Sequence, residues 1–210
     1  PKIYDPTNFS LTYAYSEVFK RSINVESNVD KIYRGLFSYN FNNRPEPVEP
    51  FRNSKVIKGK VFNLIRDFNF YPMPSQISYR IDFYRHYNEI QTRNVSNPNM
   101  IIPRTFDKDF KLNRYFDLRY NLTRSLDFDF SSQMTSRIDE PEGRINRHDD
   151  DYTWKRDSII TNLLRLGRPV LYHHVINANY QVPINKFPLL DWTSLSARYQ
   201  AQYDWEAGAI

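Results

Sequence analysis

The feature that most constrains this chain is a strict alternation of bulky apolar and polar residues, which recurs seven times over stretches of about 10 residues. Successive side chains of a β-strand point to opposite faces, so each stretch predicts a strand with one apolar and one polar face. Soluble strands usually span only about five or six residues. The pattern therefore favours seven antiparallel strands of a transmembrane β-barrel wall over a soluble β-sandwich, whose strands also alternate around a core.

The connectors between the stretches predict a sidedness. The stretches lie at 9–15, 33–41, 77–84, 110–122, 125–131, 170–180 and 194–205. If the first strand, at about 8–19, runs outward, the loops 20–31, 91–108 and 137–167 lie outside, and the links 43–75, 123–125 and 183–190 lie inside. All three outer loops are long and two of the inner links are short, which is typical of outer-membrane barrels. The tight link 123–125 predicts a hairpin.

The parity of each stretch assigns its side chains to lipid or to a watery lumen. The residues predicted to face lipid are Phe9, Leu11, Tyr13, Ile77, Tyr79, Ile81, Phe83, Phe116, Leu118, Tyr120, Leu122, Phe128, Phe130, Tyr172, Ile176, Tyr199, Tyr203 and Trp205. Those predicted to face the lumen are Arg80, Asp82, Asp117, Arg119, Asp127, Asp129, Asn177, Asn179, Arg198, Gln200 and Gln202.

Three polar residues, Arg85, Arg114 and His174, interrupt the apolar parity. Each lies about eight residues from the inner end of its strand, which is near the top of an apolar band about 25 Å tall. A charge costs several kcal/mol at the membrane midplane and roughly 0–1 kcal/mol at the interface. We therefore expect all three at one height, at the outer lipid head groups.

Two connectors predict short helices. The link 43–75 is read as a periplasmic connector in which RPEPVEPF (44–51) is extended and Val61, Phe62, Leu64, Ile65 and Phe68 recur at helical spacing. The loop 137–167 is read as an extracellular loop. Its helix is expected to start at an N-cap Asp157, to carry the apolar stripe Ile159, Ile160, Leu163, Leu164 and Leu166, and to stop at Gly167. This helix is expected to fold over the extracellular rim.

Composition narrows the classes of protein that fit. The chain is 40% hydrophobic and 16% aromatic, with a mean hydropathy of -0.70, and contains no apolar run near the roughly 20 residues of a membrane helix. Its 16 Tyr and 15 Phe suit the aromatic girdles of a barrel. The absence of Cys excludes disulfides and thiolate metal sites. The net charge of +5 is scattered without a dense basic run, so no nucleic-acid partner is expected.

No group of residues predicts catalysis or metal binding. Asp127 and Asp129 lie on one strand face, as an acid–base pair would, but alternating lumen-facing residues explain them without chemistry. The run His148–Asp151 lacks the DxDxDG spacing and distal Glu of a calcium loop, and is read as solvated. The adjacent His173 and His174 face opposite sides of a strand, which disfavours joint metal ligation. We expect no enzyme activity and no cofactor.

Five segments are distinctive enough to be compared with a known family: RPEPVEPF (44–51), LIRDFNFYPMPSQISYRIDFYRHYNE (64–89), RIDEP (137–141), LGRPVLYHHVINANYQVPINKFPLLDW (166–192) and ARYQAQYDWEAG (197–208). They resemble SprA, also called Sov, the family of outer-membrane translocons of the type 9 secretion system of Bacteroidota. The resemblance spans nearly the whole chain but only an internal part of the much longer family chain. It implies a very large single-chain barrel of about 36 strands in the outer membrane of a Gram-negative bacterium.

The resemblance also implies a function and partners. Proteins of this family pass folded cargo that carries a type 9 C-terminal signal, including adhesins in gliding species. Their partners are a lipid-side PorV-like barrel, which caps a lateral opening, and a periplasmic plug protein, besides the lipid of the outer membrane. None of these contacts follows from the spacing of residues in this chain.

The odd strand count predicts that the seven strands are incomplete, because bacterial barrels have even numbers and an open sheet would expose two unpaired edges in lipid. The chain also starts at Pro1 and stops just after the last strand, so both ends are expected to be cut. The missing neighbours are expected from the rest of the same barrel chain. Two alternatives remain: a fragment of a TonB-dependent nutrient receptor, with about 22 strands and a plug domain, and a surface-exposed adhesive β-domain.

Overall fold

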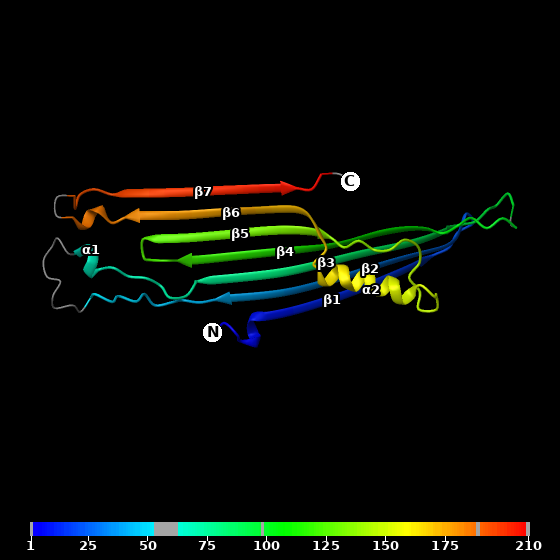
Figure 1. Cartoon of the computed structure of the whole chain (residues 1–210), viewed down its shortest axis with the longest axis horizontal. Coiled ribbons are helices and arrows are strands. Elements are labelled where there is room, and N and C mark those ends of the chain that lie inside the picture. Colours follow the sequence, from blue (N-terminus) through cyan, green and yellow to red (C-terminus); the bar gives the residue numbers. More distant parts are fainter. Residues whose placement is uncertain (1, 53–62, 98, 188–189, 209–210) are drawn as a thin grey trace.

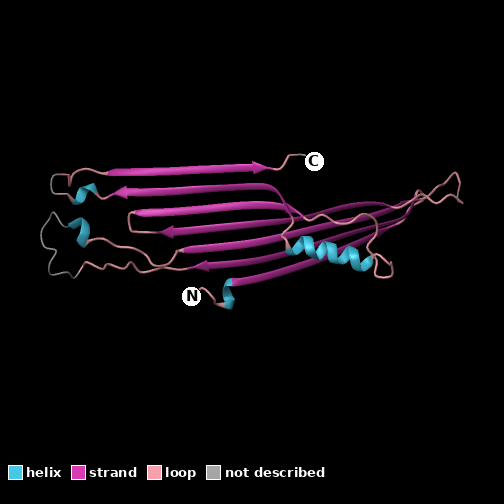
Figure 2. Ribbon diagram, in the orientation of Figure 1, coloured by secondary structure: helices cyan, strands magenta, loops and turns pink. Residues whose placement is uncertain are grey.

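The computed structural model describes residues 2–52, 63–97, 99–187 and 190–208, which form one seven-stranded antiparallel sheet (Figures 1 and 2). The strands are β1 (Phe9–Lys20), β2 (Val25–Asn42), β3 (Gln76–Thr92), β4 (Thr105–Asn121), β5 (Leu126–Arg137), β6 (Arg168–Val182) and β7 (Leu195–Glu206). They lie side by side in sequence order. The sheet is not closed, since among the described residues β1 and β7 each pair with one strand. The fold is all-β, as the alternation predicts.

Helices contribute little to the fold. α1 (Asn63–Arg66) is a single turn, α2 (Tyr152–Leu164) is the longer helix, and the 3₁₀ turns η1 (Pro6–Asn8) and η3 (Ile184–Lys186) lie in connectors. Of the described helices, none has the length and hydropathy to cross a membrane. The short helix predicted in 43–75 is present as α1, although Val61 and Phe62 lie outside the described residues.

Aromatic and β-branched residues form these strands because their side chains pack well on a pleated surface. Cross-strand aromatic pairs fix the register: the ring centroids of Phe9 and Tyr39 lie 4.9 Å apart, and so do those of Tyr15 and Tyr33. Gly35 lies beneath the ring of Phe83, where a Cβ would come within 1.7 Å of a ring carbon. Only glycine leaves this ring room on β2.

The connector lengths differ from the sequence-based scheme. The predicted hairpin at 123–125 is confirmed, since Leu122 N donates to Leu126 O at 2.9 Å. The predicted long loop 20–31 is wrong, because residues 25–31 belong to β2 and only 21–24 connect it to β1. We call the end of the sheet with the 122–125 turn the inner end, and the opposite end the outer end. Each end now has one tight turn, one connector of intermediate length (183–194 or 93–104) and one long connector, so connector length alone does not assign sidedness.

The long helix also differs from the prediction at its start. α2 begins after Asp151, so Asp157 lies inside the helix and is not its N-cap. The helix ends as a Schellman motif, in which Gly167 N donates to Asn162 O and Leu166 N to Leu163 O, both at 2.9 Å. Gly167 is therefore part of the stop, as expected, and both Leu166, with φ 62°, and Gly167, with φ 68°, are left-handed.

Candidate membrane-facing surface and outer ion-pair cluster

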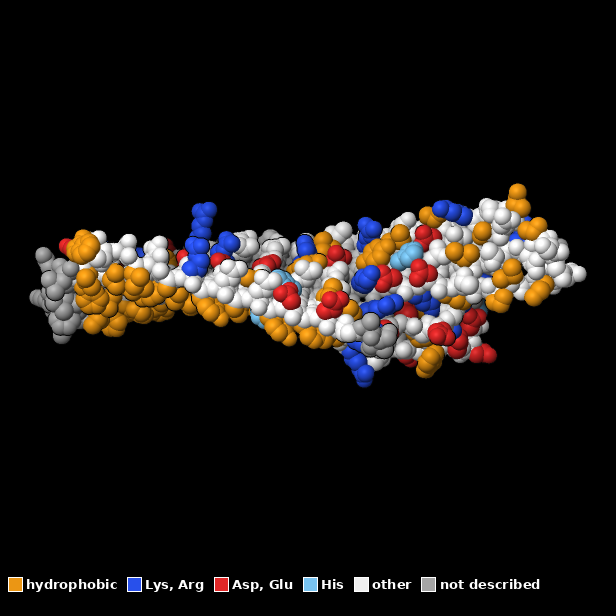
Figure 3. All heavy atoms as spheres, turned by 90° about the horizontal axis from the view of Figure 1, so that it is seen from above, with side chains coloured by type: hydrophobic (Ala, Val, Ile, Leu, Met, Phe, Trp, Pro, Cys, Tyr) orange, Lys and Arg blue, Asp and Glu red, His pale blue; other side chains and the backbone are white. Residues whose placement is uncertain are grey.

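One face of the sheet collects the apolar parity of all seven strands. In an antiparallel sheet directly paired residues share a face, and Leu118 pairs with Ile77 on one side and with Phe130 on the other. The same rule joins Ile77 to Phe41 and Phe130 to Ile176. Every strand residue predicted to face lipid lies on this apolar face, and only Leu122 lies outside a strand, in the turn. In Figure 3 hydrophobic side chains gather along the lower side of the inner half.

The inner part of the apolar face is only partly covered. On the edge strands β1 and β7, Leu11 is 78% exposed, Tyr199 63% and Tyr203 50%. On the central strands the residues of this face, such as Leu118 and Phe130, are half-exposed. The buried cluster of the chain is small, consisting of Phe110, Leu112 and Ile138 with the partly buried Ile81, Phe83 and Ile159. Contiguous exposed apolar surface of this kind marks a site that contacts lipid or another protein.

The opposite, polar face carries cross-strand polar contacts instead of a core. Arg119 Nε donates to Asp129 Oδ1 at 3.0 Å, and Arg198 Nε donates to Asn179 Oδ1 at 2.9 Å. The Arg80 guanidinium lies 4.1 Å from the centre of the Tyr115 ring. All residues predicted to face the lumen lie on this face. The separation of the two parities is thus complete over the predicted residues.

If the inner ends of the hairpins lie at one level, their stagger sets the tilt of the strands. Gln76 pairs with Arg119, Asn121 with Asp127 and Leu126 with Tyr180, so each inner hairpin is displaced by roughly two to three residues from the one before. With about 3.3 Å per residue and about 4.8 Å between strands, this corresponds to a tilt of about 40°. Apolar residues of β4 run from Leu112 to the turn at Leu122, a span about 25 Å tall at that tilt.

The three residues that interrupt the apolar face do not share one level. Arg85 pairs with Phe110 and Arg114 with Ile81, so Arg85 lies four residues farther out along the β3–β4 pair. Once the strand tilt of about 40° is included, Arg114 and His174 come level with each other and Arg85 stays farther out. The register therefore places Arg85 farther out than the other two, and the position of all three at the outer lipid head groups stays a prediction.

These interruptions also have different surroundings. The Arg85 guanidinium forms a two-pronged ion pair with Glu140. The Arg114 guanidinium reaches outward to Ser136 Oγ at 3.1 Å, while its Nε is buried without a hydrogen-bond partner among the described residues. His174 stacks on Tyr203 with ring centroids 5.4 Å apart. Arg114 thus directs its charge away from the centre of the apolar band, as long basic side chains do near an interface.

The connector 138–167 covers the outer part of the apolar face. Ile138 and Ile159 pack on Phe110 and Leu112, and Ile138 N donates to Phe110 O at 2.8 Å. Lys108 Nζ donates to Pro141 O and Gly143 O at 2.7 and 2.6 Å. The loop therefore folds against the face predicted to contact lipid and not over the opposite face. Figure 1 shows α2 in front of the sheet on this side.

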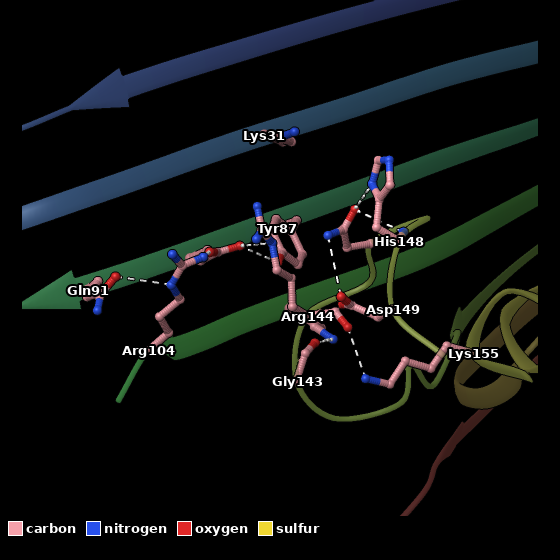
Figure 4. A network of polar contacts seen from close by, with 12 residues as sticks. Lys31, Tyr87, Gln91, Arg104, Gly143, Arg144, His148, Asp149 and Lys155 are labelled. Carbon is pink, nitrogen blue, oxygen red and sulfur yellow. Dashed lines mark hydrogen bonds and ion pairs between the residues drawn. The ribbon is translucent and has the colours of Figure 1, made fainter. Parts of the chain in front are cut away.

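An ion-pair cluster lies at the outer end, centred on Glu89, which is 4% exposed (Figure 4). Tyr87 Oη donates to Glu89 Oε2 at 2.9 Å, Arg104 Nη1 to Glu89 Oε1 at 2.5 Å, and Arg144 Nε lies 3.4 Å from Oε2. A cavity of about 340 Å³ opens beside Glu89 and is also lined by Glu17, Lys31 and Arg85. Acidic and basic side chains both line it, and among them Lys31 pairs with Glu17 and Arg144 with Glu89.

Several of the remaining candidate side chains contact other side chains of the chain. Asp129 contacts Arg119, and Asp151 of the acidic run pairs with Lys155 at 2.7 Å. His173 bonds Asp204 on the polar face while His174 lies on the apolar face, so the two do point to opposite sides. In the part of the chain that the structure describes, no three His, Cys, Asp or Glu residues are placed to hold a metal ion.

Sequence reasoning missed the residues that hold the outer end together. Glu89, Glu140 and Lys155 are all close to fully buried and paired, yet none was a candidate. Glu89 lies on the apolar parity of β3, two positions beyond Tyr87, and this break in parity was the available signal. The comparisons with known proteins find no family model and no curated protein that matches this chain.

Proposed function

We propose that this chain is part of the wall of an outer-membrane β-barrel, with the apolar face toward lipid and the polar face toward a water-filled channel. One observation carries the proposal: a register that gathers the apolar parity of seven strands onto one face that is only partly covered. A tilt of about 40° and an apolar span of about 25 Å match the dimensions of such barrels. The open edges at β1 and β7 are consistent with further strands from the rest of the same polypeptide.

The channel that this wall serves is proposed to be a protein-conducting one. The motif segments that resemble the SprA family support a translocon that exports folded cargo with a type 9 C-terminal signal across the outer membrane of Bacteroidota. In that role no side chain of the wall performs a chemical step. The hydrated polar face, with contacts such as Arg119–Asp129, offers passing cargo no large apolar patch to bind.

Cysteine scanning tests the membrane assignment. The chain has no Cys, so single substitutions in the full-length protein give site-specific labels once any cysteines outside residues 1–210 are removed. We expect Leu118→Cys and Phe130→Cys to react with a lipid-soluble maleimide only, and Asp117→Cys and Asp129→Cys to react with a water-soluble one. Equal reaction of all four with the water-soluble reagent would refute the barrel assignment and favour an adhesive surface domain.

A second measurement separates a protein-conducting channel from a nutrient receptor. Attaching a bulky polyethylene glycol maleimide at Asp129→Cys should reduce export of signal-bearing cargo, because the polymer occupies the channel. The same label on Thr153→Cys, in the connector, is the control and should leave export unchanged. Normal cargo export with a loss of small-nutrient uptake would instead favour the TonB-dependent receptor.

A further inference from the structure

The helix α2 lies on the same face of the sheet as the apolar band, but nearer the outer end of the sheet. A Cβ on Gly167 would come within 2.7 Å of Arg137 O, and Arg137 pairs with Lys111, so the C-terminal end of α2 lies at the top of the band. Its N-terminal end lies farther out, where Lys155 and Lys108 both bind carbonyls of residues 141–144. The helix therefore points its C-terminal turns toward the membrane-facing surface, as Figure 1 shows.

The side of α2 that faces the sheet is mostly polar. It carries Tyr152, Lys155, Ile159 and Asn162, which recur at helical spacing and are buried or half-buried. Lys155 Nζ donates to Arg144 O at 2.9 Å and pairs with Asp151, and Asn162 Nδ2 donates to Asp139 O at 2.9 Å. Hydrogen bonds with its own connector thus hold the helix in place, and of its aliphatic side chains Ile159 alone belongs to the packed cluster.

The outward side of α2 changes from polar to apolar toward the band. Thr153, Asp157, Ile160 and Leu164 share this side, since they are spaced by three or four residues. The first two are exposed polar residues, whereas Ile160 is 44% and Leu164 77% exposed. A surface helix of a soluble protein turns its apolar residues inward. Here Ile160 and Leu164 face outward at the end of the helix nearest the band, while Trp154, 65% exposed, lies in the first turn and is not part of this side.

Leu166, two residues after the end of α2, is another apolar residue that stays exposed. Leu166 adopts φ 62°, a left-handed conformation that costs a non-glycine residue about 1–2 kcal/mol. Its side chain nevertheless remains 41% exposed. Contacts within the chain do not fully cover Leu163, Leu164 or Leu166, and an apolar environment outside it would.

We propose that the C-terminal turns of α2 enter the outer boundary of the lipid layer that covers the apolar face, with Ile160 and Leu164 in contact with lipid. This inference rests on the proposed membrane function. Lipid is the occupant that the geometry favours, because the partly covered apolar face of the sheet continues directly into the exposed end of α2. Thr153 and Asp157 remain in water. The connector 138–167 is thereby a membrane-interface anchor on the outside of the barrel wall.

Spin labels along the outward side of α2 test this. Single cysteines at Thr153, Asp157, Ile160 and Leu164 of the full-length protein, reconstituted into lipid bilayers, carry a nitroxide whose collisions with oxygen and with a water-soluble nickel chelate are measured. Thr153 and Leu164 are three turns apart on one side, so they form a matched pair that differs in depth by roughly 16 Å along the helix. We expect the oxygen-to-nickel ratio to rise severalfold from Thr153 to Leu164, with Ile160 between them.

Labels at Leu118 and Phe130 of the apolar band distinguish a failure of this inference from a failure of the proposed function. If the band is lipid-exposed but Leu164 collides with nickel as freely as Thr153 does, the inference is wrong and the barrel assignment stands. If Leu164 is shielded from both reagents, a protein covers α2 and the lipid contact is refuted. If the band positions are also water-exposed, the proposed function fails with it.

Discussion

The inner half of this sheet contains all seven strands, whereas only β1–β4 continue into the outer half, and the two halves are stabilised differently. In the inner half every strand alternates, and apolar side chains such as Leu118 and Phe130 lie on a face that is only partly covered. In the outer half of β2–β4 charged residues appear on that same face, and Glu89 and Glu140 bind arginines beneath a connector. The comparison teaches that one continuous sheet meets two environments, with the boundary near Leu112 and Phe110.

The largest effect is expected from a charge in the inner half. In the proposed barrel, Leu118→Arg places a guanidinium near the middle of the apolar band, which should destabilise the folded protein by about 2–4 kcal/mol. The measurement is the yield of folded full-length protein in the outer membrane. Asp117→Arg, one position away on the polar face, is the matched control and should fold at nearly the parent yield. Equal losses for both variants would remove the distinction between the two faces.

In the outer half the corresponding change is the removal of a charge. Glu89→Ala deprives Arg104 and Arg144 of their carboxylate and Tyr87 of its acceptor. We expect a local loss of about 2–3 kcal/mol, less than for a fully buried pair because water reaches both arginines. Faster amide hydrogen exchange in 84–92 and 104–110 of the intact protein reports this loss.

Glu142→Ala is the control for Glu89→Ala, because Glu142 is an exposed acid in the connector 138–167, which also carries Arg144. It should leave exchange in these strands unchanged. If the two variants behave alike, ion pairing at Glu89 does not stabilise the outer half.

The junction between the two halves is tested at Gly167. Gly167→Ala forces a side chain at φ +68° and brings its Cβ within 2.7 Å of Arg137 O. The expected cost is about 1–2 kcal/mol, and it should appear as faster exchange in 152–164 because α2 detaches from Ile138. Gly208→Ala, with open space around the Cβ, is the control. Unchanged exchange of α2 would show that Gly167 does not position the helix.

The smallest effect is expected from an ion pair that is exposed to water and joins two connectors at the inner end of the sheet. Lys186 Nζ donates to Asp67 Oδ2 at 3.0 Å, and this hydrogen bond holds the pKa of Asp67 below its usual 3.8. A carboxyl whose pKa is lower in the folded than in the unfolded state stabilises the fold at any pH above its unfolded-state pKa. This stability is lost as the pH falls through the folded-state pKa. The coupling between Asp67→Asn and Lys186→Ala should be below about 1 kcal/mol at pH 7.

That coupling should vanish once the pH falls well below 3.8, and exchange of the amides in 183–187 measures it. A coupling that persists in acid would mean that the two connectors are held together by contacts other than this ion pair.

The alternation was sufficient to predict the seven strands, their faces and the hairpin at 122–125, because side-chain parity is a local property of a strand. The prediction failed where the alternation of apolar and polar residues ends. Residues 25–31 carry polar side chains on both faces, so nothing local distinguishes them from a loop, and they become a strand by pairing with 87–92 of β3 and with 17–20 of β1. The early start of α2 was missed because residues 152–156 lack an apolar stripe.

The outer cluster was harder to predict for a different reason. Its partners come from β3, β4 and the connector 138–167, and Arg85 and Glu140 are brought together only by the fold. A sequence shows that Arg85 breaks the apolar parity, but not that a carboxylate lies within reach. The same long-range folding brings the 138–167 connector onto the apolar face, through Ile138 and Ile159.

The neighbour-by-neighbour order of the sheet has a consequence for how the chain folds. β1 and β2 are joined by residues 21–24 and β4 and β5 by 122–125, whereas β2–β3 and β5–β6 are separated by the long connectors 43–75 and 138–167. Closing a long connector costs roughly 2 kcal/mol more entropy than closing a tight turn. The two tight hairpins should therefore nucleate first, with β3 and β6 added to preformed edges, so that the wall assembles from hairpins and not from single strands.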